Sequence, residues 1–172
     1  DEKAGALLKE AIAMGADKGV LLEDTAFTDG DSFANAYVLS LGIKKIGDFD
    51  LIICGNSAED NPVGEIGPRL AEIFNVEQAA FVVGLDKIFD KNITVKRMID
   101  ENNISSLDIN LPAMIAVVKD SNKPRVPNAI KIMKAAKAEI IKWGAADINA
   151  DITGCGTSGS AVRISNTFVP EG

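Results

Sequence analysis

The chain of 172 residues contains no histidine. Histidine is the commonest general base at neutral pH, the base of Ser-His-Asp triads and the commonest metal ligand in proteins. Its absence excludes triad hydrolases of that type and metal centres held by imidazole. Carboxylates are numerous but scattered, and no pair stands in surroundings that would separate two pKa values for acid–base catalysis. The sequence therefore gives little support to an acid–base enzyme.

Cysteine is also scarce. The two cysteines, Cys54 and Cys155, are far apart and belong to no Cys-x-x-Cys pair, so neither a disulfide framework nor a metal site is indicated. Cys54 follows the apolar residues 51–53 and is expected to be a small core residue. Cys155 stands in a glycine-rich stretch, a position compatible with exposure to solvent. A reducing, cytoplasmic compartment fits this cysteine usage best.

Positive charge is in short supply. The chain has 18 Lys and Arg against 25 Asp and Glu, a formal net charge of −7. Nucleic-acid binding depends on neutralising phosphates, so this balance argues against a nucleic acid and against an anionic membrane surface. No apolar run approaches the roughly 18 residues of a membrane-spanning helix. Hydrophobic residues at 47% and charged residues at 25% are typical of a globular domain with a buried core.

Helix and strand patterns alternate through the first half of the chain. Helical periodicity is found at 1–14, 31–46 and 65–74, and apolar runs typical of buried strands at 19–22, 49–54 and 79–85. This alternation with short connections predicts an α/β fold, a Rossmann-like parallel sheet covered by helices on both faces. Ligands of such sheets bind beyond the carboxyl ends of the strands.

The second half has a different pattern. Alternating apolar residues at 93–99 and 104–109 predict a hairpin, and the apolar run 111–118 a further core strand. A short Lys/Ala helix at 130–138 and a short strand at 139–143 follow. Beyond Trp143 the residues are small and polar, which predicts an extended arm. We therefore divide the chain into an α/β domain, 1–143, and a C-terminal arm, 144–172.

The most informative segment is the strand–loop–helix at 50–74. A helix N-terminus presents unpaired N–H groups and a partial positive charge, and glycine in the preceding loop lets a phosphate approach the backbone. Gly55 leaves the strand, Gly64 precedes the helix, and Asp60 and Asn61 could cap N–H groups or contact a ribose. The segment predicts a nucleotide phosphate site. Because it has neither a GxGxxG nor a Walker A spacing, a purely structural loop is an open alternative.

Several charged residues have two interpretations. Glu65, in the first turn of that helix, would repel a phosphate unless its side chain turns away. Arg97 is either a solvated charge on the hairpin or a contact to an anionic cofactor or a partner. Lys131, Lys134 and Lys137 recur at helical spacing, which is typical of a solvated face.

Taken together, several blocks along the chain resemble the β subunit of electron transfer flavoproteins. The blocks are KEAIAMGAD at 9–17, DLIICG at 50–55, GPRLAE at 67–72, VKR at 95–97, LPA at 111–113, NKPR at 122–125 and IMKA at 132–135. They occur in order along nearly the whole chain. The resemblance implies an adenine-nucleotide-binding fold of the adenine nucleotide alpha-hydrolase type. It also implies an electron carrier rather than a substrate-transforming enzyme, with flavin-based bifurcation as a further possibility.

The resemblance implies cofactors and a site. The family's β subunit pairs with an α subunit that holds the redox FAD, and its own site holds AMP in simple carriers or a second FAD in bifurcating ones. By resemblance, Ala58, Asn61, Gly64, Glu65 and Ile66 surround that nucleotide, largely through backbone groups.

The resemblance also implies partners. Arg97 would lie towards the flavin and the subunit interface, and the arm would embrace the α subunit. A docking segment would meet an acyl-CoA dehydrogenase-type or other flavin dehydrogenase; its candidate residues are Pro124, Arg125, Ala129, Met133 and Lys134.

The chain departs from the family pattern at a few positions. The family usually has Gln at the positions of Ser57 and Glu65, and Leu at that of Ala129. The family also begins with a further strand–helix–strand portion, so the chain looks like the C-terminal two-thirds of a β subunit. The alternative is a stand-alone adenine-nucleotide-binding regulatory domain of the universal stress protein type, which would bind ATP or AMP as a homodimer.

Overall fold

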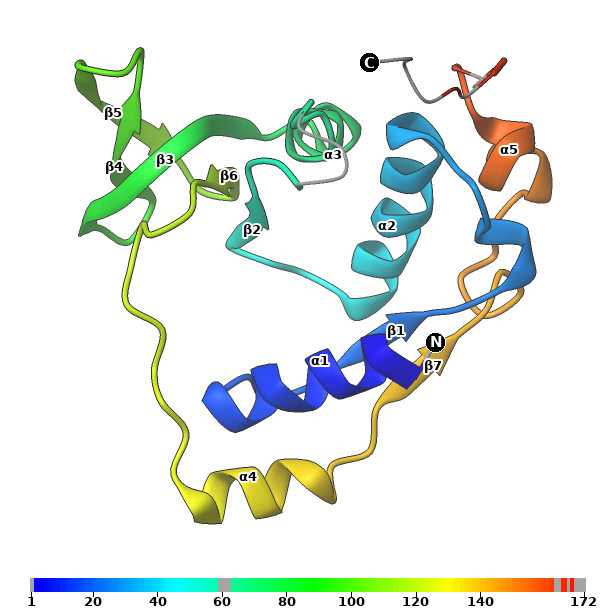
Figure 1. Cartoon of the computed structure of the whole chain (residues 1–172). Helices are drawn as coiled ribbons and strands as arrows, with labels where there is room; N and C mark the ends of the chain where they lie inside the picture. The colour runs from blue at the N-terminus through cyan, green and yellow to red at the C-terminus, as the bar shows by residue number, and fades with distance from the viewer. Residues whose placement is uncertain (1, 59–62, 163–164, 167, 169–172) are drawn as a thin grey trace.

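The computed structural model describes residues 2–58, 63–162, 165, 166 and 168, and Figure 1 shows how the elements are arranged. The helices are α1 (Glu2–Met14), α2 (Ser32–Ile46), α3 (Ile66–Phe74), α4 (Ala129–Ala136) and the single turn α5 (Gly156–Gly159), with short 3-10 helices η1 (Thr25–Phe27) and η2 (Ile152–Gly154). The strands are β1 (Val20–Leu22), β2 (Leu51–Gly55), β3 (Glu77–Ile88), β4 (Asn92–Met98), β5 (Ile104–Asn110), β6 (Ala113–Val117) and β7 (Ile141–Trp143). This mixed α/β architecture is consistent with the predicted Rossmann-like fold.

Local sequence signals set the ends of the first helices. The Asp31 carboxylate accepts hydrogen bonds from the N–H groups of Phe33 and Ala34 and so caps the start of α2. Gly47 ends α2 at φ 115°, where its N–H donates to the Ile43 carbonyl. These caps place α2 directly before β2, which leads into the candidate nucleotide loop.

The main sheet has five strands in the order β2-β6-β3-β4-β5. β2, β6 and β3 run parallel, whereas β3, β4 and β5 form an antiparallel meander. The predicted hairpin is therefore confirmed, and β6 returns between β2 and β3 as a core strand. α3 packs on β3 and β6, and α2 packs on α3. The buried residues of this sheet are Ala79, Val82, Ile93, Val95, Ile109, Ala113 and Ile115.

A second, two-stranded sheet lies apart from the first (Figure 1). β1 pairs in parallel with β7, with Val20 opposite Ile141 and Leu22 opposite Trp143. The expectation that strand 19–22 joins the same sheet as strand 49–54 is therefore wrong, because β1 has its partner near the C-terminal end of the chain. The extended run 118–128 connects the main sheet to α4, and α4 packs against α1.

The start of the predicted arm folds back on the domain. Residues 144–160 form η2 and α5, and the N–H of Asp151 donates to the Tyr37 hydroxyl over 3.0 Å. Cys155 is only 1% exposed and packs with Val38 and Ile148. The expectation that Cys155 could be exposed to solvent is therefore wrong. The small residues around Cys155 let this stretch of chain lie close against α2. Residues 144–160 are not extended, while most of 163–172 lies outside the described residues.

Candidate functional site

The loop between β2 and α3 borders a cavity of about 530 Å³ at the carboxyl end of β2. Five residues that the sequence singled out line this cavity together: Gly55, Ala58, Gly64, Glu65 and Ile66. Asp60 and Asn61 lie outside the described residues, so their predicted contacts remain predictions. The cavity thus lies where ligands of parallel sheets bind, beyond the end of a strand.

Backbone geometry makes glycine necessary at one point of this loop. Gly64 has φ 70°, in the left-handed region that residues with a Cβ rarely adopt. A Cβ at Gly64 would come within 2.5 Å of the Asn56 carbonyl oxygen, which belongs to the rigid backbone. Asn56 itself is fixed, since its N–H donates to the Val117 carbonyl and its amide oxygen accepts from the N–H of Phe81. The loop therefore closes tightly between the strand and the helix.

The first turn of α3 offers two backbone N–H groups ahead of Pro68, those of Ile66 and Gly67. No side chain of the described residues caps the first turn of α3. Glu65, which could have repelled a phosphate, turns towards α2: its carboxylate accepts from the Ser32 hydroxyl and lies 2.8 Å from Nη2 of Arg69. The Ser32 hydrogen bond and then the Arg69 guanidinium lower the pKa of Glu65 below its ordinary value. The carboxylate charge is thus engaged by Ser32 and by Arg69.

A close approach between α3 and β2 supports the same loop. Gly67 is buried in the first turn of α3, and a Cβ there would lie 2.9 Å from Sγ of Cys54. Cys54 also lies 3.9 Å from the Met114 sulfur on β6. It is half-buried, as expected for a packing residue, and burial raises the pKa of its thiol.

One wall of the cavity was not predicted from the sequence. Gly30, from the β1–α2 connection, and Ser32 and Asn35, from the start of α2, line the same cavity as the loop after β2. A neighbouring cavity of about 770 Å³ shares several of these lining residues and extends to 157–162. The signal that could have found this wall is the N-cap Asp31-Ser32, since loops that follow strands of one α/β fold meet at the same edge.

Asp31 holds the C-terminal segment against this wall. Its N–H donates to the Ser160 hydroxyl over 2.9 Å, and its carboxylate accepts from the N–H of Val162 over 2.9 Å. Burial opposes ionisation of Asp31, but hydrogen bonds from Ala34 and Val162 outweigh it and lower the pKa. The second cavity is therefore partly built by residues of the predicted arm.

Arg97 does not line this cavity. It lies on β4 opposite Val82 of β3 and Ser105 of β5, and its side chain is partly buried. Its Nε atom is buried and has no hydrogen-bond partner among the described residues. A simple solvated charge does not account for this atom, so the predicted contact of Arg97 with a flavin or a partner stays a prediction.

The predicted docking residues lie at the opposite end of the molecule, around α4. Pro124, Arg125, Ala129, Met133 and Lys134 are all exposed. Lys131 and Lys137 are exposed as well, as expected for a solvated face. The exposure leaves this surface accessible to a partner, whereas the docking itself remains a prediction.

Two kinds of feature were not found within the described ranges. No helix there is long and apolar enough to cross a membrane. No group of three or more acidic or cysteine side chains there is arranged to hold a metal ion.

Comparison with known proteins decides the family. The family model described as "Electron transfer flavoprotein domain" matches residues 1–148. The chain belongs to the electron transfer flavoprotein family. The resemblance drawn from the sequence blocks is thereby confirmed, since similar curated proteins are named as β subunits of these flavoproteins or as FixA.

Three relatives illustrate how much of this chain, and how much of their own length, the similarity covers. The electron transfer flavoprotein subunit beta of Megasphaera elsdenii is 33% identical over 98% of this chain and 64% of its own length. The caffeyl-CoA reductase-Etf complex subunit CarD of Acetobacterium woodii is 32% identical over 98% of this chain and 63% of its own. Protein FixA of Bradyrhizobium diazoefficiens is 31% identical over 95% of this chain and 59% of its own. The chain thus spans less than two thirds of the length of these relatives.

Proposed function

We propose that this chain acts as an electron transfer flavoprotein β subunit that holds an adenine nucleotide, AMP or a second FAD, beside the loop 55–66. In that role it supports electron transfer between a dehydrogenase and an acceptor through the FAD of an α subunit. The single observation that carries the proposal is the cavity in which Gly55, Ala58, Gly64, Glu65 and Ile66 meet, in a chain of this family. The chain would be a carrier subunit, and the bound flavin would supply the redox chemistry.

Three features of the cavity fit a nucleotide phosphate. No side chain of the described residues caps the first turn of α3, Gly64 lets the backbone approach closely, and the Glu65 carboxylate is turned to Ser32 and Arg69. A phosphate bound there would accept hydrogen bonds from backbone N–H groups at the positive end of the helix. Ser32 and Asn35 stand across the cavity, where hydroxyl and amide groups can meet a ribose.

The test is to identify the nucleotide released from the complex of this chain with its α subunit. Mass analysis of the denatured complex should find AMP for a simple carrier and a second FAD for a bifurcating one. Gly64→Ala should lower nucleotide content, because the new Cβ strains the backbone and meets the Asn56 carbonyl. Gly84→Ala is the matched control, since a Cβ at Gly84 meets nothing within 4 Å.

The same purification tests the partner. Coexpression with a cognate α subunit should give a heterodimer that carries flavin. If no complex and no flavin are obtained, the proposal fails. A homodimer that binds ATP without a second subunit would instead support a regulatory domain of the universal stress protein type.

The names of the relatives suggest the kind of dehydrogenase. One relative is named as a subunit of a caffeyl-CoA reductase complex and another, from Anaerotignum propionicum, as an acryloyl-CoA reductase electron transfer subunit. For this chain we propose an acyl-CoA dehydrogenase-type flavoprotein as the docking partner. Rates of flavin reduction with a panel of such enzymes would test it.

A further inference from the structure

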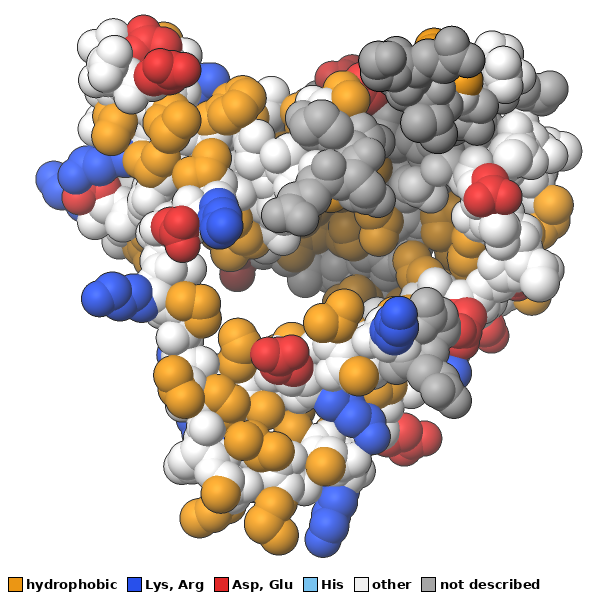
Figure 2. Space-filling model, in the orientation of Figure 1, with side chains coloured by type: hydrophobic (Ala, Val, Ile, Leu, Met, Phe, Trp, Pro, Cys, Tyr) orange, Lys and Arg blue, Asp and Glu red, His pale blue; other side chains and the backbone are white. Residues whose placement is uncertain are grey.

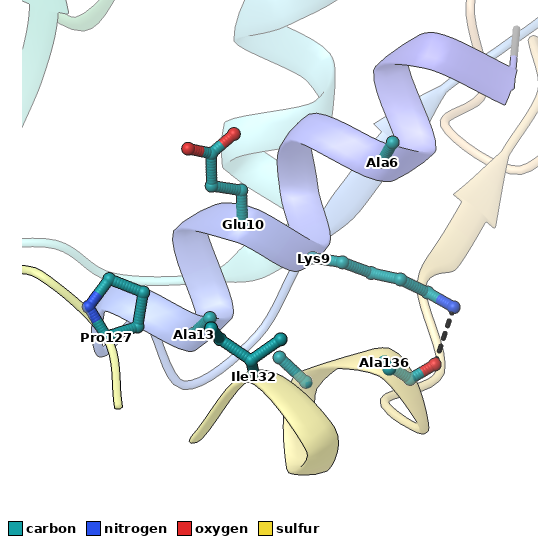
Figure 3. Close-up of a pocket in the computed structure, with 8 residues that line it drawn as sticks. Ala6, Lys9, Glu10, Ala13, Pro127, Ile132 and Ala136 are labelled. Atoms are coloured by element: carbon teal, nitrogen blue, oxygen red, sulfur yellow. Dashed lines mark hydrogen bonds between the residues drawn. The ribbon is translucent and has the colours of Figure 1, made fainter. Parts of the chain in front are cut away.

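A groove between α1 and α4 is not explained by the nucleotide site. It encloses about 380 Å³, and small or apolar side chains form most of its lining: Ala6, Ala13, Pro127, Ile132, Ala135 and Ala136. Figure 3 shows Ala13 and Ile132 facing one another across it, with Pro127 at one end and Ala136 near the other. Because these side chains are short, the two helices leave space for a group from outside.

The surroundings of the groove are positively charged, in contrast to the chain as a whole. Residues 119–142 contain seven Lys and Arg but only two Asp and Glu, while the whole chain has a net charge of −7. Lys9 stands at one end, where its ammonium group donates to the Ala136 carbonyl over 2.8 Å. At the other end Nη1 of Arg125 would lie 3.2 Å from a Cβ on Gly15. Carboxylates of a partner would therefore be favoured near both ends.

Apolar side chains continue the surface beyond the groove. Val126 is 93% exposed, Ile130 77% and Met133 65%. Figure 2 shows hydrophobic side chains gathered over the lower part of the molecule, where α1 and α4 lie, with Lys and Arg among them. An exposed apolar patch of this kind is typical of a protein interaction site.

We propose that this groove receives an apolar side chain of a protein partner whose neighbouring residues are acidic. The volume fits a large aliphatic anchor, and the flanking Lys9 and Arg125 complement carboxylates beside it. Ala129 offers no large side chain of its own, so here the chain is the receptor and the partner supplies the anchor. The inference goes beyond the proposed function, which assigns docking to this end of the molecule but not its chemistry.

The test uses the full chain, isotope-labelled for NMR, and a short synthetic peptide with one central leucine between glutamates. The methyl resonances of Ala6, Ala13 and Ala135 should shift on titration. A peptide with alanine in place of leucine should bind about tenfold more weakly, the cost of withdrawing a large aliphatic side chain from a pocket. No shift at these methyl groups, or equal binding of the two peptides, overturns the proposal.

Variants of the chain separate the groove from the rest of α4. Ala136→Leu fills the groove and should weaken the peptide about tenfold, while Ala146→Leu, an exposed alanine outside the groove, should leave it unchanged. Arg125→Glu should also weaken binding, in contrast to Lys87→Glu on the distant hairpin. If Ala136→Leu binds like the unmodified chain, the proposal is wrong. The experiment involves neither nucleotide nor α subunit, so its failure would not bear on the proposed function.

Discussion

The two sheets of this protein are stabilised to different degrees. The five-stranded sheet has a continuous core of seven buried residues, several of them Val and Ile from neighbouring strands. The hydrophobic cluster near β1 and β7 contains three buried residues, Val38, Ile148 and Cys155, with half-buried side chains around them. Since apolar area removed from water is the main source of stability, the five-stranded sheet should be the more stable part.

This difference matches the roles proposed for the two regions. The candidate nucleotide loop extends from the end of β2 and is fixed to β6 and β3 through Asn56. The groove and the exposed docking residues belong to α1 and α4, which lie on the side of the two-stranded sheet (Figure 1). A rigid base suits a site that positions backbone N–H groups, whereas a surface that adapts to a partner tolerates looser packing.

The largest effect is expected from Ile93→Ala in the five-stranded core. Ile93 is 2% exposed, so truncation removes buried methyl groups and leaves a cavity, which should lower the free energy of unfolding by about 3 kcal/mol. Urea denaturation measures this value. Ile88→Ala is the control, because Ile88 on β3 is 71% exposed and should change stability by less than about 0.5 kcal/mol. Equal effects of the two variants would contradict the proposed core.

A smaller loss is expected from Ile148→Ala in the other region. Ile148 is 5% exposed, but its neighbours are half-buried and can collapse into the space, so we expect about 2 kcal/mol. Ile152→Ala, at 54% exposure, is the control. Hydrogen exchange should show faster opening of residues 144–160 in the Ile148 variant, with strands β3 and β4 unaffected. A loss larger than that of Ile93→Ala would reverse the comparison.

The elements could be predicted from the sequence to the extent that their signals are local. The hairpin β4–β5 follows from alternating apolar residues, and α2 from Asp31 and helical periodicity. The pairing of β1 with β7 could not be predicted, because three-residue strands separated by more than a hundred residues carry no register signal of their own. Burial of Cys155 was missed for a related reason: small polar neighbours predict exposure, but here they allow close contact with α2.

The candidate site was predictable in part for the same reason. Gly55 and Gly64 could be found because the strand, the glycine and the helix are contiguous in sequence. The wall at Ser32 and Asn35 depends on how the start of α2 packs beside the loop, so the local pattern at 50–74 could not reveal it.

A single hydrogen-bonded carboxylate should have a smaller effect on the same region. Asp24 accepts from the N–H of Ala26 over 3.0 Å and from that of Ala145 over 2.8 Å, so it joins the end of β1 to the turn after β7. These two backbone hydrogen bonds lower the pKa of Asp24. Asp24→Ala should lower the melting temperature less than Ile148→Ala does, because Asp24 is more accessible to water. Asp90→Ala, in the exposed turn of the main sheet, is the matched control; an equal decrease there would exclude a specific role for Asp24.

The smallest effect is expected where the two regions meet, at Glu65. Its pKa is lowered by the Ser32 hydroxyl and then by Arg69, so the folded state binds the proton less readily than the unfolded state. A lowered pKa stabilises the fold above the unfolded-state value and loses that contribution as pH falls through the folded-state value. Melting temperatures of the unmodified chain and of Glu65→Gln should therefore differ at neutral pH and converge in acid, below the ordinary pKa of glutamate. Glu72→Gln, an exposed control on the same helix, should show no such convergence; a Glu65→Gln difference that is independent of pH would show that the carboxylate charge does not connect α2 to α3.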